Sequence, residues 1–130
     1  MSARALFRTL GLSPLEADVL QAIMDAHPDH ADLILSQLDH ATVASRRRTG
    51  VGFFLNFAVS PPTLFEPADF ELNDVYGDLE DLEYGAGFLL FIRKGKLDFL
   101  EGHTFGDEDW PETIGDYEIA IQSPSRGMVH

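Results

Sequence analysis

The stretch that decides the fold is GFLLFIRKGKLDFLEG, residues 87–102. Two apolar runs flank the pair Lys94-Gly95, a pattern typical of two antiparallel strands joined by a tight turn. Alternate side chains of the first run fall on opposite faces of a strand, with Phe88, Leu90 and Ile92 on one face and Leu89 and Phe91 on the other. A strand that is apolar on both faces is usually central in its sheet and covered on both sides. We therefore expect helices over one face, and more chain or a second subunit over the other.

Further strands are predicted on both sides of this hairpin. Residues 43–62 have the pattern of two strands around the turn-type pair Thr49-Gly50. Residues 70–76 predict a short strand, and residues 115–122 predict a closing strand with alternate apolar side chains.

In the N-terminal part, apolar residues recur at the spacing of a helix instead. Ser13 and Glu16 form an S-x-x-E capping box, which predicts a helix over residues 13–26. Asp29 is the expected N-cap of a second, shorter helix over residues 30–41. A short helix is also predicted at the start of the chain.

Helices first and strands later indicate an α+β fold, with N-terminal helices packed on a mostly antiparallel sheet of about five or six strands. The length of 130 residues suits one domain. We divide residues 1–130 into a helical segment (1–41), an antiparallel sheet (42–122) and a loose tail (123–130).

The negative charge is concentrated in the second half of the chain. Residues 66–118 contain 16 of the 22 acids but three of the nine Lys and Arg residues, which accounts for the whole net charge of −13. Such a segment repels nucleic acid and anionic membranes, and it attracts basic proteins. The plainer interpretation is solubility, because a net charge far from zero keeps monomers apart. The alternative is a basic protein partner, and we expect neither nucleic acid nor membrane binding.

Composition also narrows the chemistry and the compartment. The chain has no Cys, so disulfides, thiolate metal sites and Cys nucleophiles are excluded. No apolar run approaches the roughly 18 residues of a membrane span, and the N-terminus lacks the apolar core of a signal peptide. We expect a soluble cytoplasmic protein.

The stretch FLEGHTFGDEDWPE, residues 99–112, holds the candidate site. Regular alternation would place Leu97, Phe99, Glu101 and His103 on one buried face. Glu101 and His103 are then the catalytic or ligand-binding candidates, because a buried Glu with a raised pKa suits acid–base chemistry. The favoured interpretation is structural: Glu101 accepts backbone N–H bonds and orders the loop behind it.

Asp107, Glu108, Asp109 and Trp110 are the candidate partner-binding residues. Three adjacent acids lack the alternate spacing of a calcium loop, so we expect neither a metal site nor a cofactor. Trp110 has two interpretations: a lid over the end of the sheet, or an exposed interface anchor.

The triplet Arg46-Arg47-Arg48 is the basic cluster of the chain. Alternation in a strand directs Arg46 and Arg48 one way and Arg47 the other. These side chains would pair with the domain's own acids or protect an edge strand, and an anion site remains open.

Residues 85–111 resemble a group of small uncharacterised bacterial proteins with a G-x-G-F apolar strand, an L-x-x-L-E-G strand end and an acidic loop closing on W-P. The residues that carry the resemblance are Gly87, Phe88, Gly95, Leu97, Leu100, Glu101, Gly102, Trp110 and Pro111. At His103 those proteins commonly have Tyr, so the resemblance does not imply a catalytic histidine. Some similar small acidic proteins look like immunity proteins of bacterial toxin systems.

Three functions follow from these patterns. The first is a non-enzymatic interaction protein, immunity-protein-like, that uses its acidic C-terminal surface. The second is a small enzyme or ligand-binding domain with Glu101 and His103 in a pocket. The third is a structural homo-oligomer. The chain lacks the phosphate-binding, nucleophile-elbow and zinc-helix motifs, which favours the first over an enzyme.

Overall fold

The N-terminal part of the chain folds into three helices in the computed structural model, which describes residues 3–61 and 63–122. They are α1 (Ala3–Leu10), α2 (Pro14–Ala26) and α3 (Pro28–Leu38). The predicted tail, residues 123–130, lies outside the described residues.

The start of α2 agrees with its predicted capping box, whereas the predicted start of α3 is wrong. Ser13 Oγ accepts the N–H of Glu16 at 3.1 Å, and Glu16 Oε1 accepts the N–H of Ser13 at 2.8 Å. α3 begins at Pro28 with His27 as its N-cap, so Asp29 lies in the first turn. Proline suits the first helical position, because its φ is already helical and its missing N–H would have no partner there.

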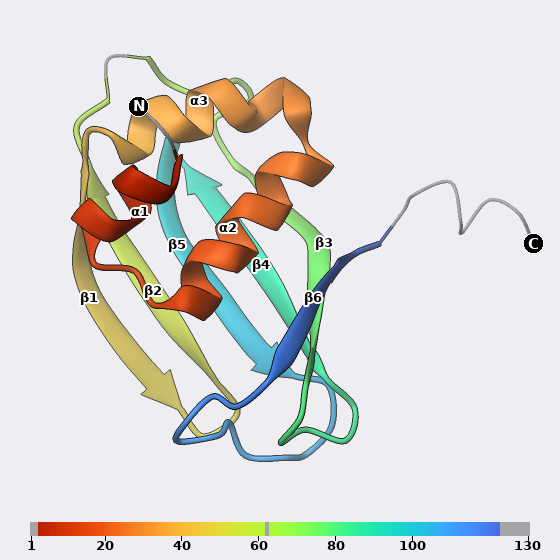
Figure 1. The fold of residues 1–130 in the computed structure, drawn as a ribbon. Helices are drawn as coiled ribbons and strands as arrows, with labels where there is room; N and C mark the ends of the chain where they lie inside the picture. Colours follow the sequence, from red (N-terminus) through yellow and green to blue (C-terminus); the bar gives the residue numbers. More distant parts are fainter. Residues whose placement is uncertain (1–2, 62, 123–130) are drawn as a thin grey trace, which may run out of the picture.

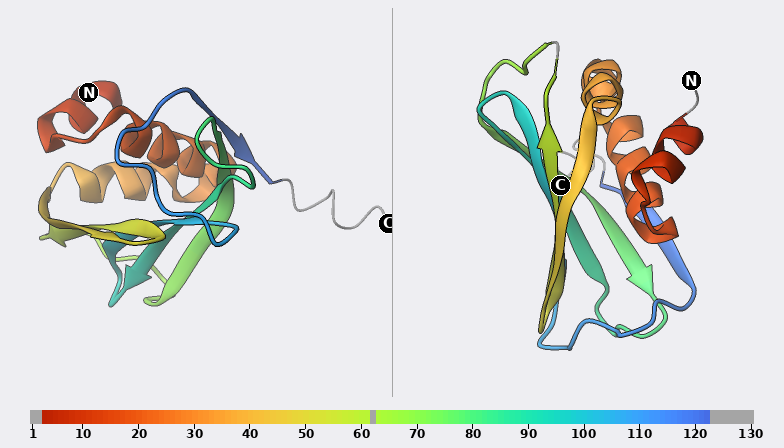
Figure 2. Two further views of the ribbon diagram at one scale, coloured as in Figure 1. Left: turned by 90° about the horizontal axis from the view of Figure 1, so that it is seen from below. Right: turned by 90° about the vertical axis from the view of Figure 1, so that its left-hand side faces the viewer.

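Six strands follow and form one antiparallel sheet in the order β1-β2-β5-β4-β3-β6. They are β1 (Ala41–Thr49), β2 (Gly52–Val59), β3 (Phe70–Leu79), β4 (Ala86–Arg93), β5 (Lys96–Thr104) and β6 (Tyr117–Ile121). All three helices lie on the same face of this sheet (Figures 1 and 2). The predicted α+β fold is confirmed.

The hairpin of β4 and β5 occupies the middle of the sheet, as its two apolar faces predict. Arg93 pairs with Lys96, and the two turn residues Lys94 and Gly95 both have positive φ, at 56° and 76°. Two consecutive positive φ values are typical of the type I′ turn, whose twist matches that of the flanking strands.

A β-bulge interrupts the alternation of β5. Phe91 pairs with Phe99, but Ile92 pairs with Leu97, so Asp98 is an extra residue in β5. A bulge lets two residues of one strand oppose a single residue of its partner, and residues beyond it change face.

The predicted shared face of Leu97, Phe99, Glu101 and His103 is therefore wrong. Leu97 points into the core beneath the helices and is 2% exposed. The other three side chains lie on the opposite, outer face of the sheet.

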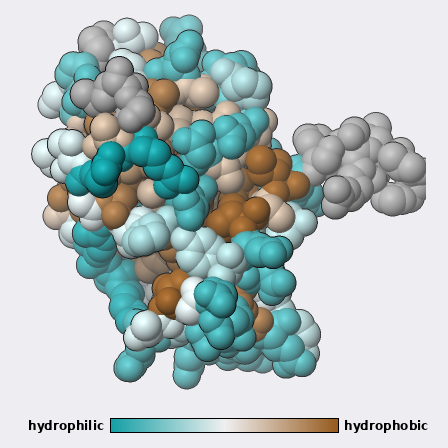
Figure 3. All heavy atoms as spheres, in the orientation of Figure 1, coloured by the Kyte–Doolittle hydropathy of each residue, from teal (hydrophilic) through white to brown (hydrophobic). Residues whose placement is uncertain are grey.

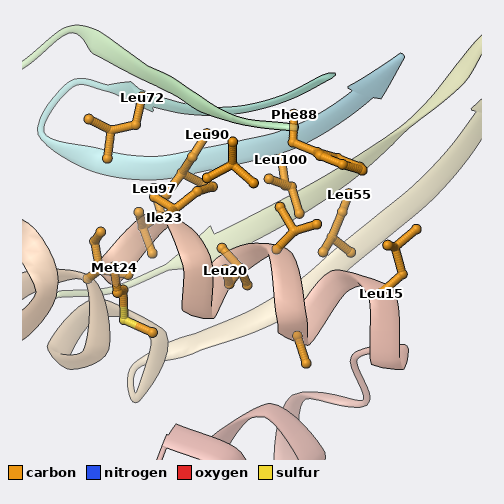
Figure 4. Close-up of a cluster of buried hydrophobic side chains, with 14 of the residues drawn as sticks. Leu15, Leu20, Ile23, Met24, Leu55, Leu72, Phe88, Leu90, Leu97 and Leu100 are labelled. Atoms are coloured by element: carbon orange, nitrogen blue, oxygen red, sulfur yellow. The ribbon is translucent and has the colours of Figure 1, made fainter. Parts of the chain in front are cut away.

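The core fills the space between the helices and the inner face of the sheet. Figure 4 shows its centre, with labelled side chains Leu15, Leu20, Ile23, Met24, Leu55, Leu72, Phe88, Leu90, Leu97 and Leu100. One polar side chain, Gln37 of α3, is fully buried beside them. Gln37 Nε2 donates to the carbonyls of Thr63 at 3.0 Å and Gly95 at 2.8 Å, and its Oε1 accepts the N–H of Leu97 at 2.8 Å.

The outer face carries a row of three aromatic side chains across β2, β5 and β4. Phe91 stacks on Phe99 with ring centroids 4.4 Å apart, and Phe54 meets Phe99 edge-on at 5.5 Å. Arg47 lies over Phe54 and Arg93 lies over Phe91, at 5.0 and 4.9 Å. No helix or strand of the described chain covers this aromatic row (Figure 2).

The edge strand β6 is fixed to α2 by Tyr117. Its hydroxyl donates to Asp18 Oδ2 at 2.7 Å, and Arg4 pairs with the other oxygen of Asp18 at 3.0 Å. Burial, and after it the hydrogen bond to Asp18, raises the pKa of Tyr117 to about 12. Both causes favour the neutral phenol in the folded protein.

We expect this contact to weaken at high pH. The raised pKa contributes stability that is fully present below the unfolded pKa, about 10 for Tyr. This contribution is lost as the pH rises through the folded value of about 12. Urea denaturation at several pH values between these limits should show a steeper loss of stability for the wild type than for Tyr117→Phe. Parallel curves for the two proteins would contradict the expectation.

Candidate functional site

Three connecting segments meet at one end of the sheet, at the bottom of Figure 1. They are residues 49–52, 80–85 and 105–116, and we call them together the loop end. Backbone hydrogen bonds hold these segments side by side. The N–H of Thr104 donates to the carbonyl of Val51 at 2.9 Å, that of Phe105 to Gly85 at 3.0 Å, and that of Trp110 to Gly50 at 2.9 Å.

Glu108 joins two of these segments. Its carboxylate accepts the backbone N–H of Glu83 at 2.9 Å and that of Tyr84 at 3.2 Å. The hydroxyl of Thr104 donates to the Glu108 carbonyl at 3.0 Å. Glu108 is therefore a structural acid that fixes the loop end.

Arg48 of β1 holds the following part of the same loop. Its guanidinium donates to the carbonyls of Trp110 at 3.3 Å, Pro111 at 2.8 Å and Glu112 at 3.4 Å. A strand on the edge of the sheet thus orders a loop more than 60 positions away in sequence.

The predicted partner-binding residues divide into two groups. Asp107 and Asp109 are exposed, but the carboxylate of Glu108 is engaged by backbone amides. Trp110 is only 8% exposed and meets the ring of Phe53 edge-on at 5.3 Å, so it is a lid of the core. Of the four, two acids are therefore free to meet a partner.

Glu101 and His103 do not form a joint site. The backbone of Glu101 pairs with Phe54 and Leu89 in the sheet, but its side chain makes no hydrogen bond or ion pair with any residue that the structure describes. The interpretation that it orders the loop is therefore wrong. The bulge turns it to the outer face, and Glu108 supplies the carboxylate instead. His103 lines a hollow of about 250 Å³ with Tyr76 and Phe105, and Glu101 is not part of its wall.

Sequence reasoning missed two aromatic residues at the loop end. Tyr84 is 64% exposed and Phe105 is 55% exposed, whereas large aromatic side chains elsewhere in the described chain are at least partly buried. Each ring lies against a glycine: a Cβ would come within 2.8 Å of Tyr84 at Gly106, and within 2.9 Å of Phe105 at Gly87. Neither glycine is next in sequence to the residue whose ring it meets, so no local signal could have located these contacts.

The acids around these rings have almost no basic partners. The ion pairs between described residues are Arg4–Asp18, His27–Asp74, His30–Asp29 and Arg46–Glu16. Within the described chain, therefore, Asp74 is the one acid of residues 66–118 with a basic partner. The exposed acids of the loop end are Glu80, Asp81, Glu83, Asp107, Asp109, Glu112 and Asp116. Figure 3 shows hydrophilic residues over most of this end.

No protein-family model, curated protein or solved structure matches the chain. The resemblance of residues 85–111 to small bacterial proteins stays a prediction. Over residues 3–61 and 63–122, no group of three His, Asp or Glu residues has a geometry that could hold a metal ion. No helix of that part is long and apolar enough to cross a bilayer.

Proposed function

We propose that the chain is a non-enzymatic interaction protein whose loop end binds a basic protein. The observation that carries this proposal is the exposure of Tyr84 and Phe105 among acids that have no basic partner within the described chain. Exposed aromatic side chains surrounded by charge are typical of binding surfaces, and scattered surface acids alone are not.

The surface suits a partner that presents Arg or Lys. Carboxylates such as Asp107 and Asp109 attract a basic protein from a distance and raise its association rate. At contact, a guanidinium group binds both a carboxylate and the face of an aromatic ring, here Tyr84 or Phe105. A bacterial toxin is the class of partner that the resemblance to immunity proteins implies.

The test begins with the immobilised wild-type protein, which should retain a basic protein from its native host. With that partner purified, Asp107→Asn combined with Asp109→Asn should slow association roughly tenfold at low ionic strength and flatten its salt dependence. Replacing Tyr84 and Phe105 by Ser should instead speed dissociation, because short-range contacts are lost. Surface plasmon resonance separates the two effects.

A matched control removes the same charge elsewhere. Asp32→Asn combined with Asp39→Asn changes two exposed acids at the α3 end of the molecule. This control should keep the association and dissociation rates within about twofold of the wild-type values, because those acids lie outside the loop end. Failure to retain any stable partner would contradict the proposal, and so would equal losses in the control and in the loop-end variant.

The other two functions have less support. A pocket enzyme needs Glu101 and His103 together, and the hollow that His103 lines does not include Glu101. The homo-oligomer is favoured by the aromatic row on the outer face, which a second copy would cover. Light scattering on the purified chain distinguishes this case, because a second copy doubles the mass without any foreign protein.

A further inference from the structure

A pocket of about 350 Å³ lies on the helix side of the sheet. It is bounded by the first turn of α2, by β1 and β2, and by residues 110–114 of the loop end. These elements surround the lower left region of Figure 1. Small-molecule sites in proteins commonly have volumes of about 300–1,000 Å³, so this pocket is large enough for a small organic ligand.

The wall of the pocket is mostly apolar and partly aromatic. Leu15 of α2, Phe53 of β2, and Trp110 and Ile114 of the loop contribute to it. The rings of Phe53 and Trp110 meet edge-on with centroids 5.3 Å apart, so the two aromatic side chains form one continuous part of the wall. Such a wall favours a ligand with a flat apolar body.

Three arginines line the pocket, Arg46, Arg47 and Arg48, together with the acids Glu16 and Glu112. Arg46 and Arg48 differ in how their charge is balanced. Arg46 is neutralised by Glu16, because its Nε and Nη2 donate to the two carboxylate oxygens at 3.0 and 2.9 Å. Arg48 has no carboxylate within ion-pair distance among residues 3–61 and 63–122, and its partners are three backbone carbonyls. A guanidinium has more N–H donors than these three bonds use.

We propose that this pocket binds a small organic carboxylate with an aromatic body. The carboxylate pairs with the guanidinium of Arg48, and the ring lies against Phe53 and Trp110. Arg48 keeps its bonds to the loop carbonyls and gains the charged partner that it otherwise lacks. The pocket shares residues 110–114 with the loop end, but the proposal does not rest on the binding of a basic protein there.

Trp110 makes the test direct, because it is the one Trp of the chain and it lines the pocket. Titration with phenylacetate should change the Trp110 fluorescence saturably and shift its indole N–H signal in NMR spectra. Phenylacetamide has the same ring and nearly the same shape without the charge. It should bind at least about tenfold more weakly, since a charge-assisted pair replaces a neutral hydrogen bond.

Three variants separate the contributions. Arg48→Met should weaken phenylacetate binding about tenfold or more and leave phenylacetamide binding nearly unchanged. Arg48 also orders the loop, so its replacement could act through the loop and not through the ligand. Ile114→Phe avoids this problem, because it keeps Arg48 and narrows the pocket, and it should abolish binding of both probes. Arg93→Met removes a charge on the outer face and should have no effect.

Three results would overturn the proposal. The first is the absence of a saturable Trp110 response to phenylacetate. The second is equal affinity for phenylacetate and phenylacetamide, which would show that charge has no role. The third is an equal loss of affinity in Arg93→Met and Arg48→Met, which would show a long-range charge effect in place of a site.

Discussion

Replacing Gln37 by leucine should lower the free energy of unfolding by about 3 kcal/mol, because buried polar groups that lose their partner cost about 1–3 kcal/mol each. Gln37 is fully buried, and its three hydrogen bonds join α3 to the β4–β5 hairpin, through Gly95 and Leu97, and to Thr63 between β2 and β3. Leucine has a similar size, so the change removes these bonds without opening a large cavity. The N–H of Leu97 then loses its side-chain acceptor, whereas the carbonyl of Gly95 keeps the N–H of Phe65 at 2.9 Å.

The matched control is Gln21→Leu in α2. Gln21 makes one exposed side-chain hydrogen bond, to Asp25 at 3.0 Å. Its replacement should change stability by less than about 0.5 kcal/mol, as is usual for surface positions. Urea denaturation followed by circular dichroism measures the free energy of unfolding of both variants. If Gln37→Leu costs no more than Gln21→Leu, the three bonds of Gln37 do not stabilise the fold.

Gly52→Ala should have an effect of similar size, about 3 kcal/mol, at the other end of the sheet. A Cβ at Gly52 would lie 1.9 Å from the carbonyl oxygen of Gly102 in the neighbouring strand. That atom belongs to the backbone and cannot turn away as a side chain would. β2 and β5 must therefore separate where Gly52 pairs with His103, next to the segments that form the loop end.

Gly50→Ala is the control, because it lies in the same turn and a Cβ there would meet nothing within 4 Å. It should leave the unfolding free energy nearly unchanged. The comparison separates a steric effect from the general effect of replacing glycine in this turn. Equal stability of the two variants would contradict the steric argument.

Local signals predicted most of the elements correctly. Two of these signals depend on neighbouring residues alone, so the sequence is enough to predict them. They are the capping box of Ser13 and Glu16 and the turn at Lys94-Gly95. The bulge at Asp98 could not be predicted in the same way, because it depends on the register between β4 and β5. Leu-Asp-Phe has the apolar-polar-apolar pattern of a regular strand, and the error reversed the face assigned to Glu101.

The candidate site was also predicted only in part, because its contacts join residues that are far apart in sequence. Charge counting located the acidic segment, but it could not distinguish Glu108 from its neighbours Asp107 and Asp109. That distinction depends on amides 24 and 25 positions away in the chain. The arginine triplet shows the same limit, since alternation gave the directions of its side chains but not their three different partners.

The bonds from Arg48 to the loop have a consequence for local opening. β1 is an edge strand, and edge strands belong to the parts of a protein that open without global unfolding. Because Arg48 and the carbonyl of Gly50 both hold the segment around Trp110, we expect that segment to exchange its amide hydrogens together with β1. We therefore expect the loop and the edge strand to open as one cooperative unit, so that fraying of a strand on the far side of the sheet from β6 shortens the time for which the loop stays closed.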